Sequence, residues 1–290
     1  MIFVDGLGAP EAPVCLKDGS WLVVEMSGDR GCITHISSDG QSRRVVATTG
    51  CPNGLALDRH GCIWVAESGN PSLIRASMGG ETEIFATECA GERFLFPNDL
   101  AFGPDGALYM SDSGIVRSEW VLSDAIRTDY LEVGLDGRLY KIDVRTGAVT
   151  KLDSGLRFAN GLAFASNGDL YVNETVTGTV YRYPWRHGEI ARERQEFGNV
   201  SSPMFSAGMG GADGMKFDVR GNLYVAVHGQ GNVAVLAPSG EVVRRIKTHG
   251  TMPTNVAFGL PGTRRVFVTE CELGTLESHQ VGADGLPLHL

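Results

Sequence analysis

The chain has 290 residues, of which 42% are hydrophobic and 20% charged, and this composition is typical of a globular protein rather than a disordered one. Its formal net charge of −9 argues against nucleic acid as a partner, because contacts with phosphates need a basic surface. No apolar run is long enough to span a membrane, and the first residues do not resemble a signal peptide, so we expect a cytoplasmic protein.

In chain order, one pattern of about seventeen residues recurs six times. Each copy has a small polar pair, an apolar trio, a turn that contains glycine and then alternating apolar residues. The copies begin at Ala9, Cys51, Phe96, Phe158, Gly211 and Met252. Successive copies begin 41 to 62 residues apart, and self-similarity at a period of about forty to fifty residues indicates an array of supersecondary units.

Each copy predicts a pair of short strands joined by a hairpin turn, such as "SNG" or "PDG". Most copies are followed by two further strand-like segments, for example residues 178–184 and 241–247. Four antiparallel strands in about 45 residues are typical of a propeller blade. The repeats therefore predict an all-β, six-bladed β-propeller of four-stranded blades, formed as a single domain by residues 1–290. The last copy leaves little sequence for its blade, so we expect residues 1–7 to supply its final strand.

Equivalent positions of a closed ring of repeats lie at one height around its central channel. The third residue of every copy carries a side-chain oxygen, and we call these six the ring residues: Glu11, Asn53, Asn98, Asn160, Asp213 and Thr254. Two carboxylates and several amide oxygens form a ligand set suited to a hard cation such as Ca²⁺ in the central channel. The alternative is that Asn-Gly, Asn-Asp and Asp-Gly merely form turns at the strand starts.

A second set of acidic residues closes the second strand of five copies. We expect these side chains on the rim near the channel mouth, with capping and solvation as their ordinary role: Glu25, Glu67, Asp112, Glu174 and Glu270.

His228 takes a similar place after the second strand of the copy that contains Asp213. It could face the mouth and move protons, although a structural or surface role is the alternative.

The chain resembles the calcium-dependent six-bladed propellers of the senescence marker protein/gluconolactonase/luciferin-regenerating enzyme family, to which diisopropyl fluorophosphatase is related. The resemblance covers essentially the whole chain. The segments that carry it are "PEAP", "PNDLAFGPDG", "ANGLAF" and "ADGMKFD", at residues 10–13, 97–106, 159–164 and 212–218.

The resemblance implies that Glu11, Asn160 and Asp213 bind the metal and that Asn98 approaches the metal or the substrate. It implies Ca²⁺ as cofactor, with Zn²⁺, Mg²⁺ or Mn²⁺ as possible substitutes. Asn53 and Thr254 do not match ligands of that family, which suggests a supporting or substrate-facing role. The residues expected to bind substrate are Asn98, Asp99, Phe96, Asn53, Trp120 and His228.

Phe96 stands where sugar lactonases of this family often carry an arginine that binds substrate hydroxyls, and Arg93 lies nearby in the sequence. Residues 113–134 and 197–211 carry the extra length of the third and fourth copies, and we expect them to form two lids over the channel mouth. Trp120, Met204 and Phe205 would make that roof apolar. These features predict a preference for an apolar lactone over a sugar lactone.

We therefore expect a metal-dependent hydrolase that opens small lactones or related esters, acting as a monomer or small homo-oligomer. The metal would polarise the carbonyl group while water attacks, and Asp213 would accept the proton; a hydroxide on the metal is the alternative base. Phosphotriester hydrolysis at the same site is one alternative function. A non-enzymatic ligand-binding propeller with a structural metal is another, because this fold serves many functions.

Overall fold

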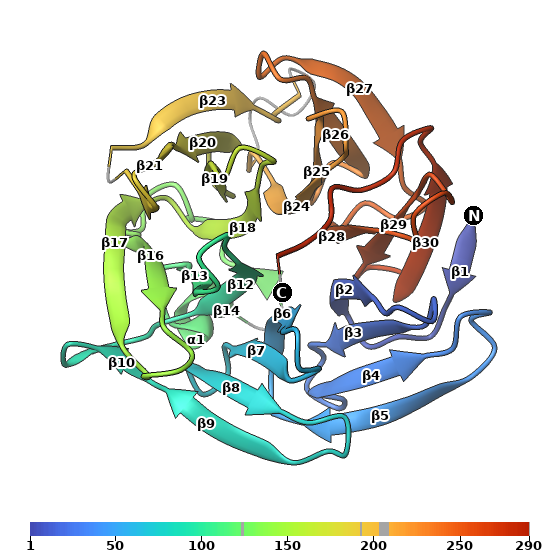
Figure 1. The fold of residues 1–290 in the computed structure, drawn as a ribbon, viewed down its shortest axis with the longest axis horizontal. Coiled ribbons are helices and arrows are strands. Elements are labelled where there is room, and N and C mark those ends of the chain that lie inside the picture. Colours follow the sequence, from blue (N-terminus) through green and yellow to red (C-terminus); the bar gives the residue numbers. More distant parts are fainter. Residues whose placement is uncertain (123–124, 192, 203–208, 290) are drawn as a thin grey trace.

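The computed structural model describes residues 1–122, 125–191, 193–202 and 209–289. Six four-stranded antiparallel sheets are arranged radially, as the repeats predicted (Figure 1). We number the blades in chain order, naming each by its strands from the channel outward. Blade 1 contains β2 (Pro10–Cys15), β3 (Trp21–Glu25), β4 (Cys32–Ile36) and β5 (Arg43–Thr48), and blade 2 contains β6 (Pro52–Leu57), β7 (Ile63–Glu67), β8 (Ser72–Ala76) and β9 (Thr82–Ala86).

The next two blades carry small additions. Blade 3 contains β12 (Pro97–Phe102), β13 (Leu108–Asp112), β16 (Gly137–Ile142) and β17 (Val149–Leu156), and blade 4 contains β18 (Ala159–Phe164), β19 (Leu170–Glu174), β20 (Thr179–Tyr183) and β23 (Gln195–Asn199). The chain in and just before these two blades also forms three short hairpins and one short helix: β10 (Glu88–Cys89) with β11 (Glu92–Arg93), β14 (Val121–Leu122) with β15 (Ala125–Ile126), β21 (Trp185–Arg186) with β22 (Glu189–Ile190), and α1 (Arg117–Trp120).

The ring is closed by strands from both ends of the chain. Blade 5 contains β24 (Ala212–Phe217), β25 (Leu223–Val227), β26 (Asn232–Leu236) and β27 (Val242–Lys247). Blade 6 contains β28 (Pro253–Phe258), β29 (Arg265–Glu270), β30 (Thr275–Gln280) and β1 (Ile2–Val4). β1 pairs with β30, which confirms that the first residues complete the last blade and cover its outer edge.

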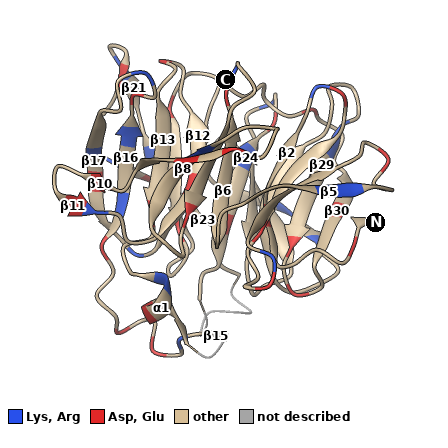
Figure 2. Ribbon diagram, turned by 90° about the horizontal axis from the view of Figure 1, so that it is seen from below, with Lys and Arg blue, Asp and Glu red and all other residues tan. Residues whose placement is uncertain are grey.

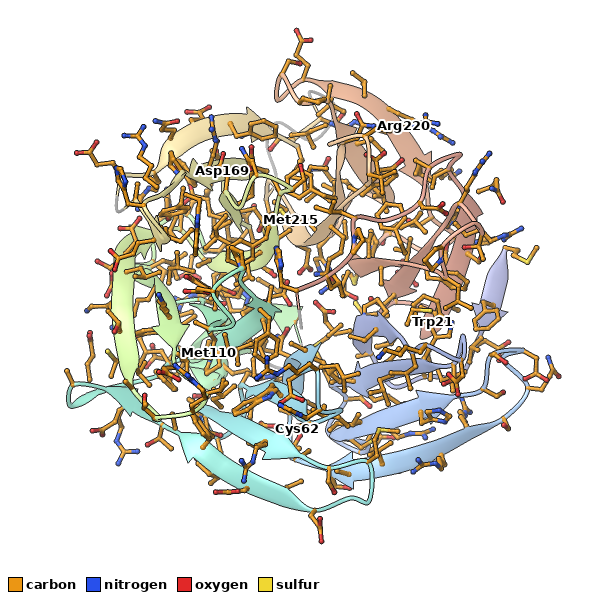
Figure 3. The ribbon with its side chains drawn as sticks, viewed as in Figure 1. Trp21, Cys62, Met110, Asp169, Met215 and Arg220 are labelled. Carbon is orange, nitrogen blue, oxygen red and sulfur yellow. The ribbon has the colours of Figure 1, made fainter. Side chains whose placement is uncertain are left out.

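Among the described residues, a cluster of buried hydrophobic side chains lies between each pair of neighbouring blades. Met110, for example, packs between blades 2 and 3, and Met215 between blades 4 and 5 (Figure 3). Strand residues alternate between the two faces of a sheet, so each blade contributes side chains to the layers on both of its sides. This packing holds the six innermost strands around one channel, and that arrangement positions the site.

Part of the first predicted lid stands out from one end of the propeller. Figure 2 shows α1 and β15 projecting beyond the blades there. Trp120 of α1 packs onto Phe158 with ring centroids 4.2 Å apart, in an apolar cluster that includes Phe96 and Met209. This lid therefore packs over the ends of blades 3 and 4. Met204 and Phe205 lie outside the described residues.

Within the described part of the chain, no helix is long and apolar enough to cross a lipid bilayer.

Candidate metal centre

The ring residues lie at the start of the innermost strand of every blade, and all six are at most 8% exposed. In each blade, the pairing of the innermost strand with its neighbour shifts register at or just beside the ring residue, as between Glu11 and Val14 or between Ala212 and Met215. Such β-bulges redirect side chains and are common beside functional sites. Here they occur at the equivalent position of the innermost strand in all six blades.

Glycines that follow three ring residues allow neighbouring strands to approach closely. A Cβ on Gly161 would lie 2.2 Å from the carbonyl oxygen of Asp213, and one on Gly214 would lie 1.8 Å from Cγ of Asn255. Gly54 is crowded in the same way by the carbonyl oxygen of Asn98. All three glycines lie inside strands, so the turn interpretation of Asn-Gly and Asp-Gly is wrong. They permit the inner strands to converge on the channel.

Asn98 and Asn160 each leave an amide oxygen without a partner. The Oδ1 atoms of both residues are buried and accept no hydrogen bond. Their Nδ2 groups, by contrast, donate bonds of 3.0 Å to Ser113 Oγ and Thr175 Oγ1. A buried carbonyl oxygen without a partner is costly, and a cation is one ligand that would satisfy both oxygens.

The two ring carboxylates are close enough to affect each other's ionisation. Burial raises the pKa of Glu11 well above its usual value, and the nearby carboxylates of Asp213 and Asp99 raise it further, against a hydrogen bond from Asn255. Burial also raises the pKa of Asp213, and the nearby carboxylate of Asp99 raises it further. Repulsion between buried carboxylates is relieved by a bound cation.

The donor set of this centre is mixed. No group of three or more His, Cys, Asp or Glu side chains suited to a metal occurs among the described residues. The candidate ligands are instead the Glu11 and Asp213 carboxylates with the free oxygens of Asn98 and Asn160. An all-oxygen set of this kind fits Ca²⁺ and does not suit a softer metal that prefers thiolate ligands.

Asn255 is a residue that the sequence analysis missed. It donates a 3.1 Å hydrogen bond from Nδ2 to Glu11 Oε1, and its Oδ1 accepts the N–H of Val256. It thereby holds the side chain of Glu11 from the neighbouring blade. Thr254, which is the ring residue of this blade, instead donates from Oγ1 to the carbonyl oxygen of Pro10 at 2.8 Å.

Asp99 and His228 both lie near the carboxylate pair. Both oxygens of Asp99 accept backbone N–H groups, from Leu100 at 2.8 Å and from Leu162 at 3.2 Å. His228 places Nδ1 3.9 Å from Asp213 Oδ2, and this nitrogen has no hydrogen-bond partner. Burial lowers the pKa of His228 to about 4, so its imidazole is neutral at pH 7. Contact of His228 with a substrate stays a prediction.

We call the five acidic residues that close the second strands the rim acids. The prediction that they are solvated is wrong. All five of these carboxylates are at most 4% exposed: Glu25, Glu67, Asp112, Glu174 and Glu270. They accept backbone N–H groups of the loops at that end, as Asp112 does from Leu95, Phe96 and Gly114. Burial raises the pKa of Asp112 despite these three bonds. The acids cap and anchor the loops and are not solvated.

The other predicted substrate residues differ in their surroundings. Phe96 and Trp120 are only 5% and 3% exposed, within the apolar cluster around Phe158. Arg93 is exposed, and its carbonyl oxygen accepts a bond from Arg138. Asn53 is buried at the ring and 8% exposed. Contact of these side chains with a substrate stays a prediction.

A cavity of about 460 Å³ lies in the channel on the side away from the lid. Asp99, Asn255 and Lys216 contribute polar side chains to its lining, and Phe102 and Phe217 are among its apolar lining residues. The segment of residues 285–289 crosses its outer end, bonded through Leu286 N–H to the carbonyl oxygen of Phe217. None of the six ring residues lines this cavity.

Residues 10–272 match the model of the SMP-30/gluconolactonase/LRE-like region. A gluconolactonase from Zymomonas mobilis is 26% identical over 270 residues, which cover 87% of this chain and 73% of that protein. Diisopropyl-fluorophosphatase from Loligo vulgaris is 28% identical over 280 residues, covering 90% and 85%. The calcium-binding protein regucalcin from Agrobacterium tumefaciens has a similar structure, with a TM-score of 0.78 at 18% identity over 100% of this chain and 98% of that one.

Proposed function

Because the chain belongs to the SMP-30/gluconolactonase/LRE-like family, we propose that it is a metal-dependent hydrolase of small lactones or related esters. The observation that carries this proposal is the pair of unpartnered amide oxygens of Asn98 and Asn160 beside the buried carboxylates of Glu11 and Asp213. Two carboxylates would balance the charge of a divalent cation, and the two amides would complete its protein ligands without adding charge. The gluconolactonase relative supports the substrate class.

Ca²⁺ is the cation that these four residues suit best. Oxygen donors that mix carboxylate and amide groups are typical of calcium sites, and Mg²⁺, Mn²⁺ or Zn²⁺ could substitute at such a site. The calcium-binding neighbour regucalcin supports this choice. When bound, the cation would act as a Lewis acid that stabilises negative charge developing on the substrate carbonyl oxygen.

Asp213 is the residue that we assign as proton acceptor for the attacking water. It is buried, and burial makes a carboxylate a stronger base than it is in water. The neutral imidazole of His228, 3.9 Å from Asp213 Oδ2, can orient that water or the substrate through its unpartnered Nδ1. Asn255 meanwhile keeps Glu11 directed toward the ring through their 3.1 Å bond.

Phosphotriester hydrolysis at the same site is a second candidate function. The relationship to diisopropyl-fluorophosphatase, which extends over 90% of this chain, favours it. The same residues would serve, since a phosphoryl oxygen can be stabilised by the same cation as a carbonyl oxygen.

Hydrolysis measured on a panel of lactones, aryl esters and diisopropyl fluorophosphate, with Ca²⁺ and with a chelator, tests the proposal. We expect lactone opening that the chelator abolishes and added Ca²⁺ restores. Equal lactone hydrolysis in both conditions would disprove the metal dependence, and fluorophosphate hydrolysis without lactone hydrolysis would favour the second function.

A further inference from the structure

Ser113 and Thr175 make the same pair of hydrogen bonds in successive blades. Ser113 Oγ accepts Asn98 Nδ2 at 3.0 Å and donates to the carbonyl oxygen of Ala159 at 3.0 Å. Thr175 Oγ1 accepts Asn160 Nδ2 at 3.0 Å and donates to the carbonyl oxygen of Ala212 at 2.8 Å. Both hydroxyl residues are at most 4% exposed. Each hydroxyl therefore links an amide of the ring to the backbone of the next blade.

This arrangement determines which end of each amide faces the channel. A backbone carbonyl oxygen can only accept, so the single hydrogen of each hydroxyl is used on Ala159 or Ala212. The hydroxyl oxygen can then only accept from the amide, and it must meet the NH₂ group rather than the oxygen. The Oδ1 atoms of Asn98 and Asn160 are consequently turned away from the hydroxyls, and both are left buried without a partner.

We propose that Ser113 and Thr175 are positioning residues that hold the amide oxygens of Asn98 and Asn160 in the orientation needed to bind the cation. This inference rests on the proposed function. Ala159 and Ala212 immediately precede the ring residues Asn160 and Asp213. The two hydroxyls thereby connect three consecutive ring residues across the junctions of blades 3 with 4 and 4 with 5, so that the spacing of the ligands is fixed as well as their orientation.

The repeat supplies a matched control at the same position. In each blade, the residue after the second strand donates its N–H to a backbone carbonyl near the start of the innermost strand. These six residues are Met26, Ser68, Ser113, Thr175, His228 and Cys271. Ser68 is buried as Ser113 is, with exposures of 1% and 0%, but the Oγ of Ser68 donates to the carbonyl oxygen of Cys51 in its own blade at 2.9 Å. Its removal therefore tests the loss of a buried hydroxyl without the loss of a link to the next blade.

Calorimetric titration of the full-length metal-free protein with Ca²⁺ tests the inference. We expect Ser113→Ala and Thr175→Val each to weaken Ca²⁺ binding by about 10–100-fold, the range typical of groups that orient metal ligands. Ser68→Ala should bind Ca²⁺ as wild type does. Ser113→Thr and Thr175→Ser keep the hydroxyl and should restore binding, which a loss of general packing would not explain.

Thermal unfolding in chelator accompanies each titration, to separate weaker binding from a weaker fold. If Ser113→Ala does not fold, Ser113→Cys keeps the size of the side chain while replacing the hydroxyl with a weak donor and acceptor, and it should bind more weakly than wild type. Wild-type affinity in the folded Ser113 and Thr175 variants, or equal losses in Ser68→Ala, overturns the inference alone. Failure of the wild-type protein to bind any divalent cation overturns it together with the proposed function.

Discussion

Asn255 Nδ2 lies 3.1 Å from Glu11 Oε1, although the two residues are separated by 244 positions in the chain. The bond crosses the junction of blades 6 and 1, where the ring closes. Asn255→Asp would keep the acceptor for Val256 N–H but remove the donor to Glu11, and it would add another carboxylate to those of Asp213 and Asp99 near Glu11. We expect this variant to unfold at a lower temperature than Asn255→Ala without metal, and to gain more from added Ca²⁺. Calorimetric unfolding curves of both variants, with and without Ca²⁺, measure this. The same unfolding temperatures for the two variants would contradict it.

Replacing Asp213 and replacing Asn160 should lower the activity for different reasons. Asp213→Asn keeps the shape of the side chain but removes a negative charge and the proton acceptor, so kcat should fall by at least ~10²-fold at saturating metal. Asn160→Ala removes a neutral ligand and should act mainly by weakening metal binding, so excess metal should partly rescue it. Steady-state kinetics over a range of metal concentrations distinguish the two. Near wild-type kcat for Asp213→Asn at saturating metal would exclude it as the base.

Removal of the metal should destabilise the protein as well as inactivate it. A ligand that binds only the folded state at 100 times its dissociation constant adds about 2.7 kcal/mol to the free energy of unfolding. For a domain of 290 residues, that gain corresponds to a rise in Tm of about 4 °C. Scanning calorimetry in chelator and in Ca²⁺ measures it. An unchanged Tm at a concentration that saturates binding would show that the cation does not bind preferentially to the folded state.

Metal binding should release protons, and more of them at lower pH. Burial raises the pKa of both Glu11 and Asp213 in the metal-free protein, so above their ordinary values of 4.5 and 3.8 these groups bind more protons when folded than when unfolded. Their contribution to the stability of the metal-free protein is therefore lost as pH rises. Near these groups, Asp99 raises both pKa values, Lys216 lowers that of Glu11 and His228 is neutral at pH 7.

Titration with Ca²⁺ in buffers of different ionisation enthalpy, at pH 5.5 and pH 8, counts the released protons. We expect a larger count at pH 5.5, and a smaller one in Asp213→Asn than in wild type. A count that is zero at both pH values would show that the carboxylates are already ionised without the metal.

The lidded end should favour an apolar substrate. The side chains of Phe96, Trp120 and Phe158 pack together there, and an unpaired buried hydroxyl of a sugar lactone would cost about 1–3 kcal/mol. We expect a higher kcat/KM for dihydrocoumarin than for gluconolactone, and a smaller ratio in Trp120→Ala, which loses apolar surface. A wild-type preference for gluconolactone would contradict this, as would a ratio that Trp120→Ala leaves unchanged.

The sequence alone determined the features of this protein that repeat. Six copies of one pattern predicted six four-stranded blades, the closing role of residues 1–7 and the alignment of Glu11, Asn98, Asn160 and Asp213, because equivalent positions of a closed ring lie at equivalent places in space. This prediction is possible from sequence because residues at equivalent positions have the same packing environment in every blade.

Only the tertiary structure decided which groups meet across blade junctions. The links from Ser113 to Ala159, from Thr175 to Ala212 and from Asn255 to Glu11 join residues that are 46, 37 and 244 positions apart. Burial of the rim acids could not be read locally either, because a carboxylate at a strand end is solvated or buried according to the loops that fold over it. Comparing the residue after the second strand in all six copies would have drawn attention to Ser113 and Thr175, but not to their partners.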